Sequence, residues 1–260
     1  MISAAARRLR AAGSDTPRLD AELLLMRALG TTREDLVRRG DEPLPIAVER
    51  EFQRLMERRI AHEPVAYILG WKAFRNFELM VDRRVLIPRP DTETLVDQAF
   101  GYAPLHGRVH DVGTGSGAVA LALKDERPDL TVTASDVSPD AVEVARANAE
   151  RLGIDVAIDL WDGLPPGDYD LVVANLPYVR EDEWDSLPPD IREHEPRLAL
   201  ASGADGLDAI RALVAQARPG VVLALEHAPT QAEAVRALLV DARSERDLAG
   251  RERVTVGRAP

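Results

Sequence analysis

From residue 108 onward, short apolar runs alternate with segments of helical periodicity, and this alternation restricts the possible folds more than any other feature of the chain. Each apolar run followed by an amphipathic helix is the repeating unit of a parallel sheet with crossover helices. The sequence therefore predicts an α/β fold built on a doubly wound, Rossmann-like sheet. The predicted strands cover residues 108–112, 131–136, 155–159, 169–174 and 220–226, and the predicted helices cover residues 117–125, 139–152, 205–218 and 230–242. A loop over residues 244–253 leads to a last short strand at 254–256.

The segment before residue 65 has helical patterns and no strand pattern. One amphipathic pattern runs from Leu19 to Leu29 and is closed by Gly30, and a second runs from Ile46 to Ile60. In the second pattern Phe52, Leu55 and Met56 share one face. We predict a small N-terminal helical domain over residues 1–64.

Residues 65–90 are expected to link this domain to the α/β domain of residues 91–260. From Val65 to Leu86 the pattern is β-like, with Phe74, Phe77, Leu79 and Val81 at roughly alternate positions, which is typical of a β-hairpin. The segment Ile87–Glu93, Ile-Pro-Arg-Pro-Asp-Thr-Glu, follows, and its two prolines require extended backbone. Asp91 or Thr92 is then expected to cap a helix that reaches about Phe100.

Composition narrows the class of protein. The chain has 260 residues, of which 45% are hydrophobic, so it can form a sizeable core and two domains. Its net charge of −11 gives no overall attraction to nucleic acid or to an anionic membrane. It has no cysteine, and its five histidines do not fall at zinc-ligand spacing, so we expect no disulfide and no metal site. The first residues lack the apolar core of a signal peptide, and no run has membrane-spanning length, which favours a cytoplasmic protein.

A glycine-rich turn follows the first predicted strand of the sheet. Turns of this kind bind NAD, FAD, phosphates or S-adenosylmethionine, so the glycines alone do not identify the ligand. The turn lacks the lysine of a phosphate-binding P-loop. Asp111, which opens it, would repel a pyrophosphate but can pair with the amino group of a methionine moiety. S-adenosylmethionine is therefore the favoured cofactor, and the candidate contacts are Asp111, Gly113, Thr114, Gly115, Ser116 and Gly117.

Two later strand ends supply the other candidate cofactor contacts. Asp136 ends the second strand, 19 residues after Gly117, where a carboxylate can accept both ribose hydroxyls. Ser138, before Pro139, is the better helix cap, which leaves Asp136 for the ligand. After the third strand, Asp159 and Leu160 are positioned to line the adenine together with Trp161 and Asp162, although Trp161 could equally be a core residue.

The fourth strand ends abruptly in Asn175-Leu176-Pro177-Tyr178, which suits the binding of a planar nitrogen group. The Asn175 carboxamide and the backbone carbonyls of Asn175 and Leu176 can accept hydrogen bonds from one NH2 group, while Pro177 has no N–H to donate. Tyr178 adds a flat face for stacking. We interpret this turn as the acceptor site of a methyl transfer, although such a tetrapeptide can also be an ordinary turn at a strand end.

With these residues together, the chain resembles the HemK family of protein glutamine methyltransferases, which methylate peptide chain release factors. The resemblance covers nearly the whole length. Besides the glycine loop and the Ile87–Glu93 block, it rests on the segments Val65–Gly70, Glu195–Leu200, Gly206-Leu207 and Asp247–Arg251.

The resemblance implies a helical domain that helps to hold the release factor and a seven-stranded methyltransferase domain with an antiparallel C-terminal hairpin. The acceptor it implies is the glutamine of a Gly-Gly-Gln tripeptide, and no nucleic acid, membrane or metal is implied as a partner. By position, the glycine loop, Asp136, Asp159, Leu160 and Asn175 would contact the cofactor. Asn175, Leu176, Pro177 and Tyr178 would receive the glutamine, with Arg89 and Pro90 close by, and Asn175, Pro177 and Tyr178 would be the catalytic positions.

Three positions depart from the family pattern. Leu176 replaces a proline, Asn76 replaces a glycine and His227 follows the Leu-Glu pair where isoleucine is usual. Two alternative functions stay open at this point. Asn-Leu-Pro-Tyr also occurs in RNA adenine dimethylases, so an adenine-N6 methyltransferase acting on RNA or DNA is one alternative. A non-catalytic relative that binds S-adenosylmethionine without turnover is the other.

Overall fold

The structure is a computed structural model that describes residues 1–39 and 42–260. The chain forms two compact units. The first consists of residues 1–71 and 188–194, and the second of residues 72–187 and 195–260. The segment expected to be a separate linker, residues 65–90, is thus divided between the two units.

The first unit is helical. Its described helices are α1 (Ile2–Ala11), α2 (Pro17–Leu29), α3 (Arg33–Arg39), α4 (Ile46–Ile60), α5 (Val65–Leu69) and α9 (Pro189–His194). The predicted helices at 19–29 and 46–60 are confirmed as α2 and α4. Gly30 ends α2 in a left-handed conformation, as the sequence pattern indicated. Leu9, Leu24, Phe52 and Met56 are fully buried between α1, α2 and α4.

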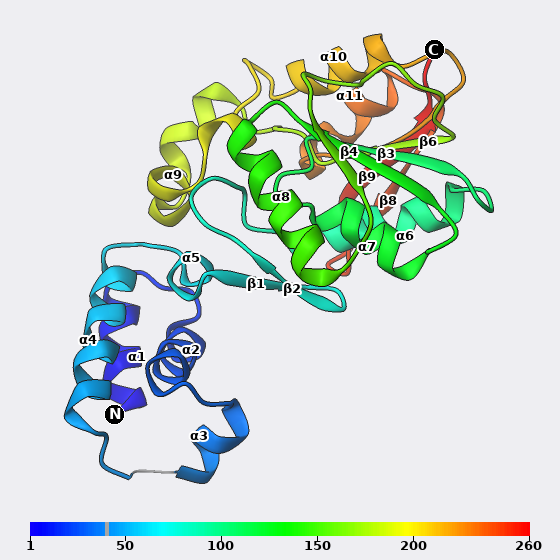
Figure 1. The fold of residues 1–260 in the computed structure, drawn as a ribbon. Helices are drawn as coiled ribbons and strands as arrows, with labels where there is room; N and C mark the ends of the chain where they lie inside the picture. Colours follow the sequence, from blue (N-terminus) through cyan, green and yellow to red (C-terminus); the bar gives the residue numbers. More distant parts are fainter. Residues whose placement is uncertain (40–41) are drawn as a thin grey trace. The chain divides into compact units, whose positions relative to one another are not determined.

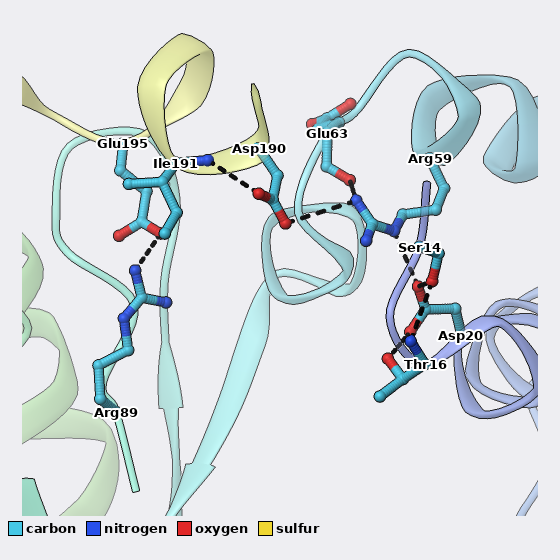
Figure 2. A network of polar contacts seen from close by, with 9 residues as sticks. All are labelled: Ser14, Thr16, Asp20, Arg59, Glu63, Arg89, Asp190, Ile191 and Glu195. Atoms are coloured by element: carbon cyan, nitrogen blue, oxygen red, sulfur yellow. Dashed lines mark hydrogen bonds and ion pairs between the residues drawn. The ribbon is translucent and has the colours of Figure 1, made fainter. Parts of the chain in front are cut away.

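A buried polar network joins α2 and α4 within this unit. Asp20 on α2 accepts hydrogen bonds from the hydroxyls of Ser14 and Thr16 and from Nε of Arg59 on α4, at 2.7–2.8 Å (Figure 2). Asp20 and Arg59 are both largely buried. Because a buried carboxylate is costly without partners, these three donors stabilise the charge of Asp20 where α2 packs on α4.

A two-stranded hairpin, β1 (Trp71–Phe74) and β2 (Phe77–Met80), follows α5. The predicted hairpin is confirmed, but the expectation that its β pattern starts at Val65 is wrong, because Val65–Leu69 is helical. Pro64 precedes this short helix, and Gly70 ends it with a φ of 82°. All five residues of α5 are apolar, so the sequence shows no periodicity that would separate a helix from a strand.

The second unit contains a seven-stranded sheet with the order β5-β4-β3-β6-β7-β9-β8. The first five strands in this order are parallel, and β9 runs antiparallel to both β7 and β8. The strands are β3 (Arg108–Val112), β4 (Thr131–Asp136), β5 (Ala157–Leu160), β6 (Leu171–Ala174), β7 (Val222–Glu226), β8 (Val240–Arg246) and β9 (Glu252–Arg258). The five predicted parallel strands and the α/β fold are therefore confirmed, with boundaries that differ by at most two residues.

Helices cover both faces of this sheet. The described helices of the second unit are α6 (Thr92–Tyr102), α7 (Ala118–Glu126), α8 (Pro139–Leu152), α10 (Asp208–Gln216) and α11 (Ala232–Arg236), with the 3-10 helices η1 (Glu181–Ser186), η2 (Arg197–Ala199) and η3 (Pro229–Gln231). Helices α6 and α7 lie on one side of the sheet and α10 and α11 on the other (Figure 1). Asp91 stands at the N-cap of α6, but its side chain makes no capping hydrogen bond.

The C-terminal region differs from the prediction. The helix expected over 230–242 ends at Arg236, and the loop expected over 244–253 is confined to residues 247–251, because β8 covers Val240–Arg246 and β9 begins at Glu252. Strand β8 lies at the edge of the sheet, and its residues are partly or fully exposed. An edge strand needs no apolar pattern, so its charged sequence resembles a helix end or a loop.

Candidate active site

A cavity of about 340 Å³ opens within the second unit at the carboxyl ends of β3, β4 and β6. Ligands of open α/β sheets bind at this edge, in the crevice where the strand order reverses. Of the predicted site residues, the cavity is lined by Asp111, Gly113, Thr114, Gly115, Ser116, Asp136, Asn175, Leu176 and Pro177. The structure thus brings together the ends of three strands that are far apart in the sequence.

The glycine loop connects β3 to α7. Gly113, Gly115 and Gly117 all have positive φ, which favours glycine. A Cβ atom on Gly113 would lie 2.9 Å from Cδ2 of Leu176, so the glycine also allows close packing of the Asn175–Tyr178 turn. Gly117 is the N-cap of α7, packs against Leu121 and does not line the cavity.

Asp111 is buried beneath this loop. Its Oδ2 atom accepts hydrogen bonds from the Thr114 hydroxyl at 2.6 Å and from the Ala120 N–H at 3.2 Å. Burial raises the pKa of Asp111 to about 7, against the effect of these two donors. Asp111 therefore supports the loop from below while it borders the cavity.

Asp136 is held at the end of β4 by two backbone donors. Oδ2 accepts from the Gly115 N–H and Oδ1 from the Ser138 N–H, both at 2.9 Å. Ser138 caps α8 through the Ala141 N–H, as predicted. A carboxylate has about four acceptor positions, so Asp136 keeps acceptor capacity for a ligand that enters the cavity.

The residues after β5 differ in position from the expectation. Asp159 and Leu160 are exposed and do not line the cavity. Trp161, Asp162 and Gly163, which follow directly, do line it. Because Trp161 is 46% exposed, it is not a core residue. The strand continues to Leu160, one residue further than predicted, which moves the cavity-facing position along the chain.

The Asn175–Tyr178 turn begins where β6 ends. Nδ2 of Asn175 donates to the Thr92 hydroxyl on α6 at 3.0 Å, so Oδ1 is the acceptor left on the carboxamide. Leu176 is buried and packs in the core with Val112, Leu213 and Leu225. This packing explains the residue that departs from the family pattern, because the leucine side chain is part of the core.

The backbone after the turn is fixed by partners that the sequence did not reveal. Val179 exchanges two backbone hydrogen bonds with residues 200 and 202, and the Tyr178 carbonyl accepts from Nε2 of Gln231 at 3.0 Å. A Cβ atom on Gly206 would lie 2.2 Å from the same carbonyl oxygen, so the Gly206-Leu207 motif allows this close approach. Burial raises the pKa of Tyr178 to about 12, so its hydroxyl stays neutral at physiological pH.

Arg89 and Pro90 do not line the cavity, although Pro88 does. Nη2 of Arg89 lies 2.5 Å from Oε1 of Glu195 (Figure 2). The backbone N–H of Ile87 donates to Oε2 of the same carboxylate at 3.2 Å. Since Pro196 also lines the cavity, this ion pair joins two parts of its wall. It explains why Ile87–Glu93 and Glu195–Leu200, which are distant in sequence, belong to one structural feature.

Asn148 on α8 is another residue that the sequence did not reveal, and it supports the glycine loop. It is completely buried, its Oδ1 accepts from the Met80 N–H at 2.7 Å, and its Nδ2 donates to the carbonyls of Met80 and Ser116 at 3.0 Å. Asn148 follows Val144 and Ala145 at helical spacing, on the apolar face of α8. A polar residue on an apolar face is the signal that could have found it.

The other two departures are structural. His227 is buried, with Nδ1 2.9 Å from the Ala228 carbonyl and Nε2 2.8 Å from the Thr255 hydroxyl. Because a carbonyl only accepts, Nδ1 carries the proton, and burial lowers the pKa of the ring. Asn76 is exposed in the β1–β2 turn, where Arg75 takes the positive φ.

Within residues 1–39 and 42–260, no group of three or more histidine, aspartate and glutamate side chains is arranged to hold a metal ion. No helix of the described chain has both the length and the apolar character to cross a membrane.

The sequence matches two domain families. Residues 1–70 match the PrmC N-terminal domain, and residues 92–187 match the methyltransferase small domain. Curated relatives match over nearly the full length. The release factor glutamine methyltransferase of Xylella fastidiosa strain 9a5c is 42% identical over 97% of both chains. Those of Salmonella typhimurium and Caulobacter vibrioides are 42% and 38% identical over 94% and 98% of this chain, and 93% and 94% of their own.

Solved structures share the fold. The Mtq2–Trm112 complex of E. cuniculi, which methylates the eRF1 translation termination factor, includes a chain with a TM-score of 0.50 and 22% identity. The match covers 68% of this chain and 99% of that one. The T. thermophilus 16S rRNA N2 G1207 methyltransferase RsmC, solved with AdoMet and guanosine, has a TM-score of 0.52 at 14% identity over 73% of this chain and 50% of its own. At these identities the similarity establishes the fold.

Proposed function

The chain belongs to the family of release factor glutamine methyltransferases, and from this premise we propose that it transfers a methyl group to the side-chain amide nitrogen of the Gly-Gly-Gln glutamine in peptide chain release factors. The observation that carries the proposal is the position of the Asn175 carboxamide. Its Oδ1 is left as an acceptor at the edge of a cavity that the glycine loop also lines. A methyl donor and an amide nitrogen can therefore meet at one place.

The residues of the cavity fit S-adenosylmethionine. Two acidic side chains, Asp111 and Asp136, border it, and an uncharged glycine loop lies between them. We assign Asp136 to the ribose hydroxyls, the glycine loop to the methionine moiety, and Trp161 and Asp162, in place of Asp159 and Leu160, to the adenine. When bound, the cofactor supplies the electrophilic methyl group of a sulfonium.

The acceptor nitrogen needs help because its lone pair is delocalised into the amide carbonyl. Oδ1 of Asn175 and the backbone carbonyl of Leu176 would accept hydrogen bonds from its two N–H groups, and Pro177 presents no competing donor. Held in this way, the nitrogen turns its lone pair out of the amide plane toward the cofactor, and the acceptors stabilise the positive charge that develops on it. Positioning of this kind can contribute up to about 7–11 kcal/mol.

We also propose that the helical unit helps to hold the release factor, with Arg89, Pro90 and Tyr178 close to the glutamine. The acceptor is then a protein, and because release factors act at the ribosome, the site of action is the cytoplasm. The departures at Leu176, His227 and Asn76 do not argue for a non-catalytic relative, since each is accommodated without change to the Asn175 carboxamide.

The test is methyl transfer from labelled S-adenosylmethionine to a purified release factor, with mass spectrometry to locate the methyl group. We expect it on the Gly-Gly-Gln glutamine, and we expect Asn175→Ala to reduce kcat by about 100-fold or more while circular dichroism stays unchanged. Asn76→Ala, which removes an exposed asparagine of the same unit, is the matched control. Methylation of RNA or DNA adenine, or cofactor binding without any transfer, would contradict the proposal.

A further inference from the structure

Glu226 ends β7 next to the Asn175 turn, and the proposed mechanism does not use it. In the parallel pairing of β6 with β7, Ala174 is the register partner of Leu225. Asn175 and Glu226 are the next residues on these adjacent strands. The side chain of Glu226 is only 1% exposed. Neither of its carboxyl oxygens has a hydrogen bond of regular geometry within the described chain. A buried carboxyl without such bonds is costly and calls for a reason.

Thr92 lies between this carboxyl and Asn175. Its hydroxyl oxygen accepts from Nδ2 of Asn175 at 3.0 Å, and its hydroxyl group also faces Glu226, whose pKa it lowers. Thr92 is buried as well, at 3% exposure, so bulk water does not compete for these contacts. A hydroxyl has one proton to donate, and in this arrangement that proton is available to Glu226.

We propose that Glu226 is a positioning residue that acts through the Thr92 hydroxyl to fix which end of the Asn175 carboxamide is presented to the acceptor glutamine. An ionised Glu226 accepts the Thr92 proton, so the Thr92 oxygen accepts from Nδ2 of Asn175, and Oδ1 is left for the glutamine NH2. This inference rests on the proposed function, because it assigns a role in the same acceptor site.

The opposite state follows when Glu226 carries a proton. The carboxylic acid then donates to the Thr92 oxygen, and the Thr92 hydroxyl is free to donate to Oδ1 of a reversed Asn175 carboxamide. The reversed amide presents NH2 toward the cavity, where it cannot accept from the glutamine NH2. Glu226, Thr92 and Asn175 thus form a hydrogen-bond relay, with one arrangement that binds the acceptor and one that does not.

The surroundings of Glu226 place the change between these states near neutral pH. Burial, with a smaller contribution from Asp91, raises its pKa to about 7, against the opposing effects of Thr92, Arg253 and Arg89. Tyr178 also faces Glu226 but keeps its proton, since its own pKa is about 12. These groups come from the segment before α6, from β9 and from the turn after β6.

The first experiment measures kcat for methylation of a full-length release factor from pH 5.5 to 8.5 with the full chain. We expect the wild-type kcat to rise with pH around a midpoint near 7, because Glu226 must lose its proton. Glu226→Gln should remove this rise. Glu252→Gln, a half-buried carboxylate on β9 paired with Arg236, is the matched control and should keep the wild-type profile.

Thr92 provides a second pair of variants. Thr92→Val should lower kcat above pH 7 by about 10- to 100-fold and flatten its pH dependence, since the carboxamide is no longer oriented, while Thr92→Ser keeps the hydroxyl and should restore most of the rate. The Kd for S-adenosylmethionine should change by no more than about two-fold in both, because the Thr92 hydroxyl contacts Asn175 and Glu226 rather than the residues assigned to the cofactor. A wild-type pH profile in Glu226→Gln, or a wild-type kcat in Thr92→Val, would overturn the proposal.

A readout without turnover separates this proposal from the proposed function. The side-chain NH2 resonances of Asn175, assigned by their loss in Asn175→Ala, should shift in NMR spectra as the wild-type protein passes through pH 7, and should not shift in Glu226→Gln. If these resonances behave as expected but no glutamine is methylated, the proposed function fails and the relay stands. If methylation occurs but the resonances do not respond to pH, the relay fails.

Discussion

Replacing Asn148 with alanine tests how the glycine loop is held in place. The substitution removes three hydrogen bonds at once, to the N–H and carbonyl of Met80 and to the carbonyl of Ser116. Ser116 is buried, so its carbonyl loses its partner in a place that water does not reach. Met80 is partly exposed, so its two groups can bind water instead.

The expected loss follows from this difference. An unsatisfied buried carbonyl costs about 1–3 kcal/mol, and each of the two rehydrated groups loses about 1 kcal/mol of net hydrogen-bond energy. The sum is about 3–5 kcal/mol, and for a domain of this size it corresponds to a decrease in Tm on the order of 10 °C. The Ser116 side of the loop also loses its support, so the affinity for S-adenosylmethionine should fall by about ten-fold.

Thermal unfolding by calorimetry and cofactor titration by isothermal calorimetry measure the two effects. Asn76→Ala is the control, because Asn76 is exposed and its hydrogen bond to Asp125, at 3.4 Å, lies at the surface. Its Tm should stay within about 2 °C of wild type. A decrease of only that size in Asn148→Ala, together with unchanged cofactor affinity, would refute the reasoning.

Three further predictions concern other parts of the structure. Burial raises the pKa of Glu226 from 4.5 to about 7, so the folded protein keeps a proton that the unfolded chain has lost in this window, and stability falls as the pH rises through it. In urea unfolding, the free energy of unfolding of Glu226→Gln relative to wild type should therefore increase by roughly 3 kcal/mol from pH 4.5 to pH 8. No increase would mean that the carboxyl is not buried in solution. Gly113→Ala should lose more stability than Gly153→Ala, since both have positive φ but only Gly113 faces Leu176, and should also lower kcat; equal losses in the two variants would count against the close packing of the loop. Asp20→Ala should destabilise the helical unit by about 3 kcal/mol through the partly unpaired Arg59, whereas Asp15→Ala, at an exposed position, should be neutral in the same urea titration; similar values for the two would show that the buried network is not stabilising.

The parallel part of the sheet could be predicted because the burial of each strand is visible in its own residues. Strands such as Leu171–Ala174 are buried on both faces and therefore appear in the sequence as continuous apolar runs. Two segments were predicted wrongly because their residues carry no such pattern. Val65–Leu69 is apolar throughout and shows no period, and Val240–Arg246 lies at an exposed edge where no apolar pattern is required.

The candidate site was predictable where a motif contributes its own geometry. The positive-φ glycines and the end of β6 at Asn175 follow from residues next to each other in the chain. The partners that hold these motifs do not, because Glu195 and Gln231 act on residues 106 and 53 positions away. From sequence alone such polar residues cannot be distinguished from surface residues, since the burial that gives them their role depends on the folded chain.

The division of the chain has a consequence for its modularity. Because residues 188–194 belong to the first unit, the backbone passes from one unit to the other at three places, after residues 71, 187 and 194. A deletion of the N-terminal helices would leave Pro189–His194 without the rest of its unit, including Arg59, which pairs with Asp190. This segment lies in the connection that leads from Tyr178 to Glu195. The helical unit is therefore not an appendage joined by a single linker, and an exchange of this unit between relatives would have to carry the later segment with it.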